Sequence, residues 1–315
     1  MSARATTEQV IVKALVIGAN GFIGSHLTDS LVIGGHEIIA FDRYTSPPTF
    51  HQTEAITPWV GEFQNQDDLA RALVNVDMVF HFLSSSTPAS AEADPTFDIR
   101  TNVAPSVELL RLCVDAGVSR VYFASSGGAI YGNSAREMSA ETDVAEPVSP
   151  YAIGKLTIES YLNYFAVKHD LESVSVRISN PYGPRQHVRK SQGLIPIVLR
   201  SILAGVPVTQ FGDGSMVRDY IFVNDLVDMI TRTVDHRPRY RIYNLGSGEG
   251  YSVGRIFDLI REVTETEFEI VTKVTPSTFV RRAVLDVGRY EREFGRRDLT
   301  DLREGIARTW TNLAG

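Results

Sequence analysis

Residues 13–24 read K-A-L-V-I-G-A-N-G-F-I-G, a short apolar run that leads directly into glycines 18, 21 and 24. The apolar run predicts a buried β-strand, and the amphipathic stretch from Phe22 onward predicts an α-helix. Gly18 permits a tight turn, Gly21 lets the backbone approach a pyrophosphate, and Gly24 lets helix and strand pack closely. The helix N-terminus offers N–H groups to an anion. The stretch therefore predicts the first βα turn of a dinucleotide-binding sheet.

A second strand-like run, residues 37–42, ends in Asp42. The carboxylate follows the glycines by about 20 residues, where dinucleotide-binding folds place the acid that accepts hydrogen bonds from the adenosine ribose. Such an acid would repel a 2′-phosphate, so the sequence predicts NAD rather than NADP. Residues near these two strand ends that we expect to contact the cofactor are Asn20, Phe22, Ile23 and Arg43.

Apolar runs of strand length alternate with amphipathic segments of helix length along the first part of the chain. The predicted strands cover residues 13–18, 37–42, 78–83, 121–125 and 174–179. This alternation predicts an α/β fold, a Rossmann-like doubly wound parallel sheet. After residue 180 the pattern loosens into Pro- and Gly-rich loops, which predicts a smaller, discontinuous C-terminal substrate-binding lobe. The expected division is an NAD-binding domain at 10–179, to which 217–247 returns, and a lobe at 180–216 and 248–315.

Composition narrows the class of protein. The chain has 315 residues, 43% hydrophobic and 22% charged, which is typical of a globular protein. No stretch offers the roughly 18 apolar residues of a membrane span, and the polar start carries no leader, so we expect a cytoplasmic protein. A net charge of −7 disfavours nucleic acid and acidic membranes as partners. Cys113 lies in an apolar run and is expected to be buried; no metal site is predicted.

Tyr151 and Lys155 lie four residues apart in S-P-Y-A-I-G-K, within a segment that is amphipathic to about residue 168. This spacing places both side chains on one face of a helix. A free phenol with a pKa near 10 is a poor base, but a nearby ammonium and a cationic nicotinamide ring both favour the phenolate. Upstream, residues 125–132 (S-S-G-G-A-I-Y-G) supply hydroxyls after a predicted strand, at the edge where α/β sheets form their sites.

The order of these motifs, followed by R-I-S-N-P-Y-G-P-R at 177–185 and F-G-D-G-S-M-V-R-D-Y-I-F-V-N-D at 211–225, resembles the extended short-chain dehydrogenase/reductase superfamily. The likeness covers residues 11 to about 250. Within the superfamily the chain is most similar to the NAD-dependent epimerase/dehydratase family and its UDP-hexose 4-epimerases. The resemblance implies that Tyr151 removes the C4 hydroxyl proton while hydride passes to NAD, giving a 4-keto sugar that rotates and takes the hydride back. Lys155 would bind the nicotinamide ribose and tune Tyr151.

The resemblance also implies a serine that hydrogen-bonds the reacting oxygen. Counting from Phe123 aligns Ser126 with this serine, whereas counting back from Tyr131 aligns Gly127. We prefer Ser126 because it has a hydroxyl, with Ser125 as the fallback. Related enzymes that dehydrate or decarboxylate the sugar carry an acid in this loop, whereas residues 127–129 here are Gly, Gly and Ala. The loop therefore favours 4-epimerisation or 4-keto reduction.

The remaining site residues are carried over from the family. For the cofactor they are Glu62 and Phe63 at the adenine, and Phe82, Leu83, Ser84, Asn102 and Ser125. For the nucleotide-sugar they are Asn180 and Arg218 at the diphosphate, the loop residues Gln192 and Gln210, and Arg281. Two departures stand out. Residues 84–86 are all serine, and the stretch P-S-T-F-V-R-R-A-V-L-D at 276–286 lacks the acid that many relatives place two or three residues after an arginine.

Three readings of function remain at this stage. The first is a UDP-hexose 4-epimerase, acting on UDP-glucose, UDP-galactose or their N-acetyl or uronic acid forms. The second is an NAD(P)H-dependent 4-ketoreductase of deoxysugar biosynthesis, which would consume reduced cofactor. The third, from a different class, is a non-catalytic NAD-binding protein on the same fold. Helices expected at 97–116 and 151–168 carry apolar surface that forms a dimer contact in relatives, so a homodimer is predicted.

Overall fold

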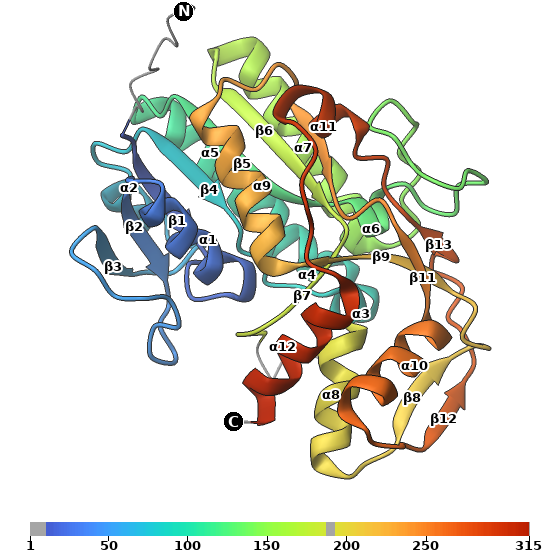
Figure 1. The fold of residues 1–315 in the computed structure, drawn as a ribbon. Helices are drawn as coiled ribbons and strands as arrows, with labels where there is room; N and C mark the ends of the chain where they lie inside the picture. Colours follow the sequence, from blue (N-terminus) through green and yellow to red (C-terminus); the bar gives the residue numbers. More distant parts are fainter. Residues whose placement is uncertain (1–10, 187–192, 315) are drawn as a thin grey trace, which may run out of the picture.

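The computed structural model describes residues 11–186 and 193–314. Its centre is a seven-stranded sheet in the order β10-β6-β5-β4-β1-β2-β3, with every pair parallel (Figure 1). The order reverses between β1 and β4, which is where such sheets bind ligands beyond their carboxyl ends. The strands are β1 (Lys13–Ile17), β2 (Glu37–Asp42), β3 (Ile56–Val60), β4 (Met78–His81), β5 (Arg120–Ser126), β6 (Glu172–Ile178) and β10 (Ile242–Leu245).

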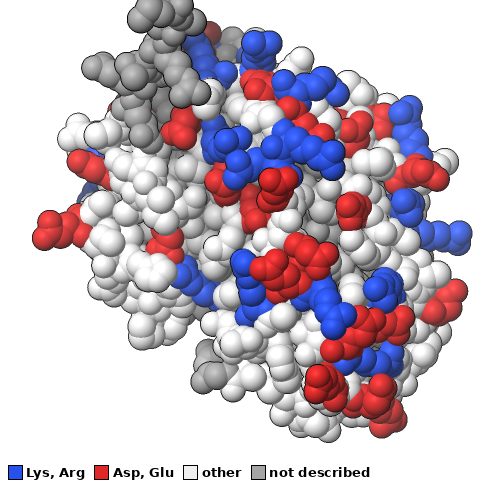
Figure 2. Space-filling view, in the orientation of Figure 1, with Lys and Arg blue, Asp and Glu red and all other residues white. Residues whose placement is uncertain are grey.

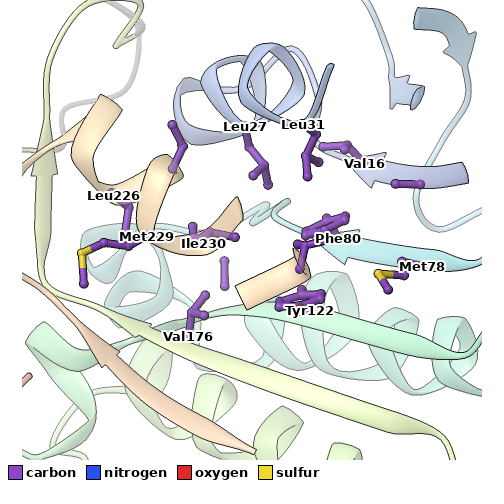
Figure 3. Packing of buried hydrophobic residues seen from close by; sticks show 14 of the residues in the cluster. Val16, Leu27, Leu31, Met78, Phe80, Tyr122, Val176, Leu226, Met229 and Ile230 are labelled. Atoms are coloured by element: carbon purple, nitrogen blue, oxygen red, sulfur yellow. The ribbon is translucent and has the colours of Figure 1, made fainter. Parts of the chain in front are cut away.

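Helices cover both faces of this sheet. One face is covered by α1 (Phe22–Ile33), α9 (Val223–Asp235) and α11 (Gly288–Phe294), the other by α2 (Gln66–Ala72), α5 (Ala104–Asp115) and α7 (Pro150–His169). Figure 3 shows Leu27 and Leu31 of α1 and Ile230 of α9 pointing towards strand residues such as Phe80 and Tyr122. Because both faces are buried, the strands are almost continuously apolar. The predicted Rossmann-like doubly wound fold is confirmed.

A smaller lobe follows the main sheet. Its helices α8 (Leu194–Ala204), α10 (Val253–Thr264) and α12 (Leu302–Ala314) pack around a separate apolar core (Figure 1). Two parallel strands, β8 (Val208–Phe211) and β12 (Ile270–Lys273), pair with each other. A third sheet joins β7 (Asn180–Tyr182), β9 (Val217–Phe222), β11 (Gly250–Ser252) and β13 (Arg282–Ala283), with β9 paired to each of the others. This sheet connects the carboxyl edge of the main sheet to the lobe.

The segment 217–247, expected to return to the NAD-binding domain, divides between the two parts. Strand β10 pairs with β6 in the main sheet and α9 packs on α1, whereas β9 belongs to the small third sheet. Conversely, α11 lies within 248–315 but places Tyr290 in the core of the main sheet. Which part binds cofactor and which binds substrate stays a prediction.

Two elements differ from the sequence-based expectation. Strand β3 was not predicted, because three of its five residues are exposed and it contains Pro58. The helix expected at 97–116 is broken into α4 (Pro95–Asp98), a π-helix (Ile99–Val103) and α5, and it follows α3 (Pro88–Ala93). A π-turn inserts one residue into the helical register and often occurs at functional sites. Here it turns Thr101 and Asn102 inward, so that both are buried.

Surface and core agree with the composition. On the face shown in Figure 2, basic and acidic side chains lie side by side rather than in a single basic patch.

Cys113 is buried on α5, as expected, and its burial raises the pKa of the thiol. Among the described residues, no helix is both long and apolar enough to cross a bilayer. The cytoplasmic location stays a prediction.

Candidate functional site

The turn between β1 and α1 leaves little room for a side chain at its three glycines, Gly18, Gly21 and Gly24. Gly18 has a φ of +87°, and a Cβ on Gly24 would lie 2.0 Å from the Gly18 carbonyl oxygen. A Cβ on Gly21 would lie 3.0 Å from the same oxygen. Helix α1 begins at Phe22 without a side-chain cap, so the N–H groups of its first turn suit an anion. This cradle fits the pyrophosphate of a dinucleotide.

Asp42 stands at the end of β2, beside the glycine turn. Its Oδ2 accepts a hydrogen bond from the Asn20 backbone N–H at 3.0 Å, and its Oδ1 accepts one from the Arg43 backbone N–H at 2.8 Å. Each carboxylate oxygen keeps a lone pair for a ribose hydroxyl. The Asn20 side chain contacts the loop after β2, where its Oδ1 accepts the Thr49 N–H at 2.9 Å. The two backbone hydrogen bonds therefore hold the Asp42 carboxylate beside the glycine turn.

Tyr151, Lys155 and Ser126 meet at the carboxyl end of β5. The Ser126 hydroxyl lies close enough to the Tyr151 phenol to lower its pKa. The Lys155 ammonium donates to the Ala124 carbonyl at 2.8 Å and lies 5.7 Å from the centre of the Tyr151 ring. Helix α7 begins with Ser149 as its N-cap and Pro150 in its first turn, which fixes where Tyr151 enters the helix.

The pKa values of the pair are shifted mainly by burial. Desolvation and the charge of Asp98 raise the pKa of Tyr151 to about 12, against the hydrogen bond from Ser126, which lowers it. Desolvation lowers the pKa of Lys155 to about 8, although Asp98 and Glu159 counteract it. At neutral pH the phenol is protonated and the ammonium is charged. An added positive charge beside the ring is then needed to favour the phenolate.

The two serines of this loop have different partners. Ser125 is buried and its hydroxyl donates to Glu159 Oε1 at 2.5 Å, beneath the sheet edge. Ser126 is partly exposed and lies beside Tyr151, whose pKa it lowers. This geometry favours Ser126 over Ser125 as the hydroxyl that reaches a substrate.

A buried ion pair lies beneath the serines, and the sequence analysis missed it. Arg177 on β6 donates to both carboxylate oxygens of Glu159 on α7, at 3.0 and 2.7 Å, and each side chain is 5% exposed. Its third nitrogen donates to the Tyr131 hydroxyl at 2.9 Å, and Tyr131 donates to Asn244 on β10 at 2.7 Å. The network ties α7 and the serine loop to two strands.

Other expected cofactor residues gather near the ends of β1 and β4. Leu83 packs its backbone against Gly18, where a Cβ would be 3.0 Å away, and Phe82 lies beside it. Ser84 donates to the Ser86 carbonyl at 2.9 Å. Two of them come from the loop after β3: Phe63 is buried against His81, the last residue of β4, with ring centres 4.9 Å apart, whereas Glu62 is exposed.

The expected substrate residues line the small third sheet. Asn180 donates to the Asp219 carbonyl at 2.9 Å and lies against Gly128. Arg218 donates to the carbonyls of Val217 at 2.8 Å and Val280 at 2.6 Å, so its guanidinium holds the segment before β13. Burial lowers its pKa. Within the part of the chain that the structure describes, the guanidinium of Arg218 contacts backbone carbonyls and no carboxylate, so its charge is suited to an anion.

The last three substrate candidates have different positions. Arg281 has an exposed side chain, and its backbone N–H donates to Asn133 Oδ1 at 2.8 Å, which joins β13 to the loop after the serines. Gln210 on β8 donates to the Gly212 carbonyl at 2.9 Å, within its own turn. Gln192 lies outside the described residues.

Asp219 is a further buried acid that the sequence analysis did not single out. Its carboxylate accepts hydrogen bonds from the Ser247 N–H and hydroxyl, both at 2.8 Å, and from the Gly248 and Leu285 N–H groups. Burial raises its pKa against these bonds. It fastens the loop after β10 and the strand end at Leu285 onto β9. Asp219 lies inside the stretch 211–225 that carries the family resemblance, and this position could have drawn attention to it.

Known proteins share the sequence pattern and the fold that surround this site. The model of the NAD dependent epimerase/dehydratase family matches residues 14–246. A UDP-glucose 4-epimerase of Mycolicibacterium smegmatis is 33% identical over 304 residues, 95% of this chain and 97% of that protein. A dTDP-4-dehydro-6-deoxyglucose reductase of Escherichia coli is 29% identical over 299 residues, 93% and 94% of the two chains.

Among solved structures, a UDP-glucose 4-epimerase of Thermotoga maritima with UDP-glucose superposes with a TM-score of 0.89 at 31% identity. The match covers 96% of this chain and 98% of that one. The likeness therefore spans the main sheet and the smaller lobe together.

Proposed function

The chain belongs to the NAD-dependent epimerase/dehydratase family of extended short-chain dehydrogenases/reductases, and on that premise we propose that it is a nucleotide-sugar 4-epimerase acting on a UDP-hexose. The observation that carries the proposal is the meeting of Tyr151, Ser126 and Lys155 at the carboxyl end of β5. NAD is the cofactor of the family, and when bound it supplies a hydride acceptor and donor and a positive charge.

The residues of the chain then perform the proton chemistry. Ser126 orients a sugar hydroxyl towards the Tyr151 oxygen, beside which its own hydroxyl lies. The phenolate form of Tyr151 accepts the hydroxyl proton as the C4 carbon is oxidised, and the phenol returns it after the sugar has rotated. The Lys155 ammonium, held by the Ala124 carbonyl, stabilises the phenolate electrostatically.

The loop after the serines supports epimerisation over dehydration. A Cβ on Gly127 would lie 2.5 Å from Leu285 Cδ1 and 3.0 Å from the Arg177 carbonyl oxygen, so a side chain at this position would have to displace Leu285. Gly128 faces Asn180 and residue 129 is alanine. Residues 127–129 therefore supply no acid for a second proton transfer at C5 or C6.

Asn180, Arg218 and Arg281 are the residues proposed for the diphosphate. Arg218 and Arg281 come together because β13 pairs with β9 at Val217 and Arg218. Two guanidinium groups at this edge provide charge-assisted donors for a pyrophosphate. The family name of the M. smegmatis relative and the ligand of the T. maritima structure support a UDP-sugar as substrate.

A 4-ketoreductase is the second candidate, because a reductase from E. coli is nearly as similar to the chain as the epimerases are. The two candidates differ in cofactor turnover. An epimerase regenerates NAD in each cycle, whereas a reductase consumes reduced cofactor.

The test follows the C4 configuration by proton NMR. The protein is incubated separately with UDP-glucose, UDP-N-acetylglucosamine and UDP-glucuronate, with NAD but without reduced cofactor. We expect a C4 epimer of one substrate, abolished by Tyr151→Phe and retained by Tyr240→Phe, a matched change at an exposed tyrosine outside α7. Turnover of a 4-keto sugar only with NADH or NADPH would establish the reductase instead.

We further infer a homodimer that forms through α5 and α7. Helix α7 exposes Ile153, Tyr161, Tyr164 and Val167, with exposed fractions of 51%, 40%, 46% and 73%. These residues recur at helical spacing and form an apolar stripe on one face. A second copy of the chain would bury this stripe against its own.

A further inference from the structure

A buried carboxylate, Asp98, lies beside the Tyr151–Lys155 pair and has no role in the chemistry described above. It is the last residue of α4 and is 4% exposed. Its Oδ1 accepts hydrogen bonds from the Ser86 hydroxyl at 2.5 Å and from Asn102 Nδ2 at 2.9 Å. Asn102 also donates to Ser86 at 3.0 Å and accepts the Ser85 N–H at 2.8 Å. The carboxylate is thus fixed by a closed polar cluster.

The second carboxylate oxygen of Asp98 points at the helix that carries the pair. A Cβ on Gly154 would lie 2.0 Å from Asp98 Oδ2, so the carboxylate rests against the bare backbone of α7. Gly154 stands between Tyr151 and Lys155 in the sequence and directly precedes the lysine. A larger residue at position 154 would collide with the Asp98 carboxylate, so the glycine is what lets this acid lie against the turn of α7 that carries Tyr151 and Lys155.

We propose that Asp98 is a positioning residue that sets the charge balance of the Tyr151–Lys155 pair, and that Ser86, Asn102 and the absence of a side chain at Gly154 hold it in place for that purpose. The inference rests on the proposed function of Tyr151 and Lys155 as the proton-transferring pair. It deepens that function by assigning a third charged group to the site.

The groups that face the pair come from four elements. Lys155 is faced by Asp98 from α4, by Glu159 from its own helix and by His81 from β4. His81 is neutral near pH 7, because burial and Lys155 lower its pKa to about 3. Tyr151 is faced by Asp98 and by the Ser126 hydroxyl. Asp98 is therefore the single carboxylate whose charge acts on both members of the pair in the described residues.

The sign of the effect follows from the charge. A negative group disfavours the phenolate and favours the ammonium, so Asp98 raises the pKa of both Tyr151 and Lys155. Without that charge both pKa values fall. Activity requires a Tyr151 phenolate and a Lys155 ammonium, so the two pKa values set the two limbs of a bell-shaped pH profile. Both limbs would then move towards acid by about one pH unit.

The experiment uses Asp98→Asn in the full-length, NAD-loaded protein. Asparagine keeps the Oδ1 acceptor for Ser86 and Asn102, removes the charge, and replaces Oδ2 with an NH2 group of similar size. Tyrosines are labelled with ¹³C at Cζ, the Tyr151 resonance is assigned by its loss in Tyr151→Phe, and its titration is followed by NMR. The pH dependence of kcat for the epimerised substrate is measured in parallel.

Two control variants separate charge from structure. Asp94→Asn makes the same change at an exposed carboxylate that caps α4, and asparagine also caps helices. It should leave the Tyr151 titration where it is. Ser86→Ala removes a hydrogen bond of the cluster without a charge, and should lower kcat without an acid shift of the profile. If Asp98→Asn does not fold, as judged by circular dichroism, Asp98→Ser removes the charge in less space and is titrated in its place.

A fall of the Tyr151 pKa by about one unit, together with an acid shift of both limbs of the profile, supports the proposal. An unchanged Tyr151 titration in a folded variant overturns it, even if kcat falls. Failure of the proposed function looks different: the wild-type protein then epimerises none of the UDP-sugars, while the NMR titration still decides the role of Asp98.

Discussion

Replacing Arg177 with methionine should destabilise the protein severely, because it leaves Glu159 as an unpaired buried charge. Both side chains are 5% exposed, and Arg177 donates two hydrogen bonds to Glu159 and one to the Tyr131 hydroxyl. After the substitution, Ser125 is the remaining side chain that donates to the Glu159 carboxylate. Breaking a buried pair by removing one partner costs roughly 3–5 kcal/mol. We expect a loss of about 4 kcal/mol in the free energy of unfolding.

The same reasoning predicts that a second substitution restores stability. In Arg177→Met/Glu159→Met neither charge is buried, and the two methionines fill most of the volume. Replacement of a whole buried pair by apolar residues is often neutral or stabilising. The double variant should therefore unfold at a higher urea concentration than Arg177→Met alone, with a coupling energy of about 3 kcal/mol.

The assay is equilibrium unfolding in urea at pH 7, followed by circular dichroism and by intrinsic fluorescence. Arg237→Met is the matched control, because Arg237 pairs with Glu172 at the surface and its side chain is 81% exposed. The control should lose less than about 1 kcal/mol. If Arg177→Met loses as little as the control, or if the double variant is less stable than either single one, the pair does not hold α7 to β6 as argued.

Two further predictions concern the cofactor turn and the assembly. Gly24→Ala should weaken NAD binding at least about tenfold in calorimetric titration, a loss of about 1.4 kcal/mol, because the new Cβ would lie 2.0 Å from the Gly18 carbonyl oxygen. Gly254→Ala is the control and should leave NAD binding unchanged, because the nearest atom to its Cβ is 3.8 Å away. Equal effects of the two substitutions would refute the packing argument. Val167→Glu on α7 should convert a dimer to monomers in light scattering, whereas the same change at Val274, 92% exposed in the lobe, should not; a dimer that survives Val167→Glu uses another surface.

Sequence predicts those parts of the fold in which neighbours along the chain are also neighbours in space. The strands β1, β2, β4, β5 and β6 were found because strands buried on both faces are continuously apolar. Strand β3 lies at the sheet edge, and its exposed residues break that pattern. Strand β9 resembles the others in its apolar content, and no local signal shows that it pairs with β7, β11 and β13 rather than with the main sheet.

The candidate site divides in the same way. The glycine turn, Asp42 and the Tyr151–Lys155 spacing are local motifs, so they could be read from the chain. Asp98 gave no signal, because an acid followed by I-R-T-N in a helical stretch is expected on the surface. The π-helix after it and the glycine at 154 bring it inside, and both are features of three-dimensional packing. Glu159 offered a weaker clue, since it lies four residues after Lys155 on the same helix face.

The buried charges around α7 explain why the tyrosine is neutral until the site is completed. Lys155 and Arg177 contribute two positive charges, and Asp98 and Glu159 two negative ones, all less than a tenth exposed. A buried cluster of this kind is tolerated only when its charges are paired. A phenolate at Tyr151 would add an uncompensated negative charge; burial first, and then the charge of Asp98, raise the pKa of Tyr151 to about 12. In the proposed function, a cationic nicotinamide ring bound beside Tyr151 would restore the balance with the phenolate present, so cofactor binding and ionisation of the base would be coupled through the same set of charges.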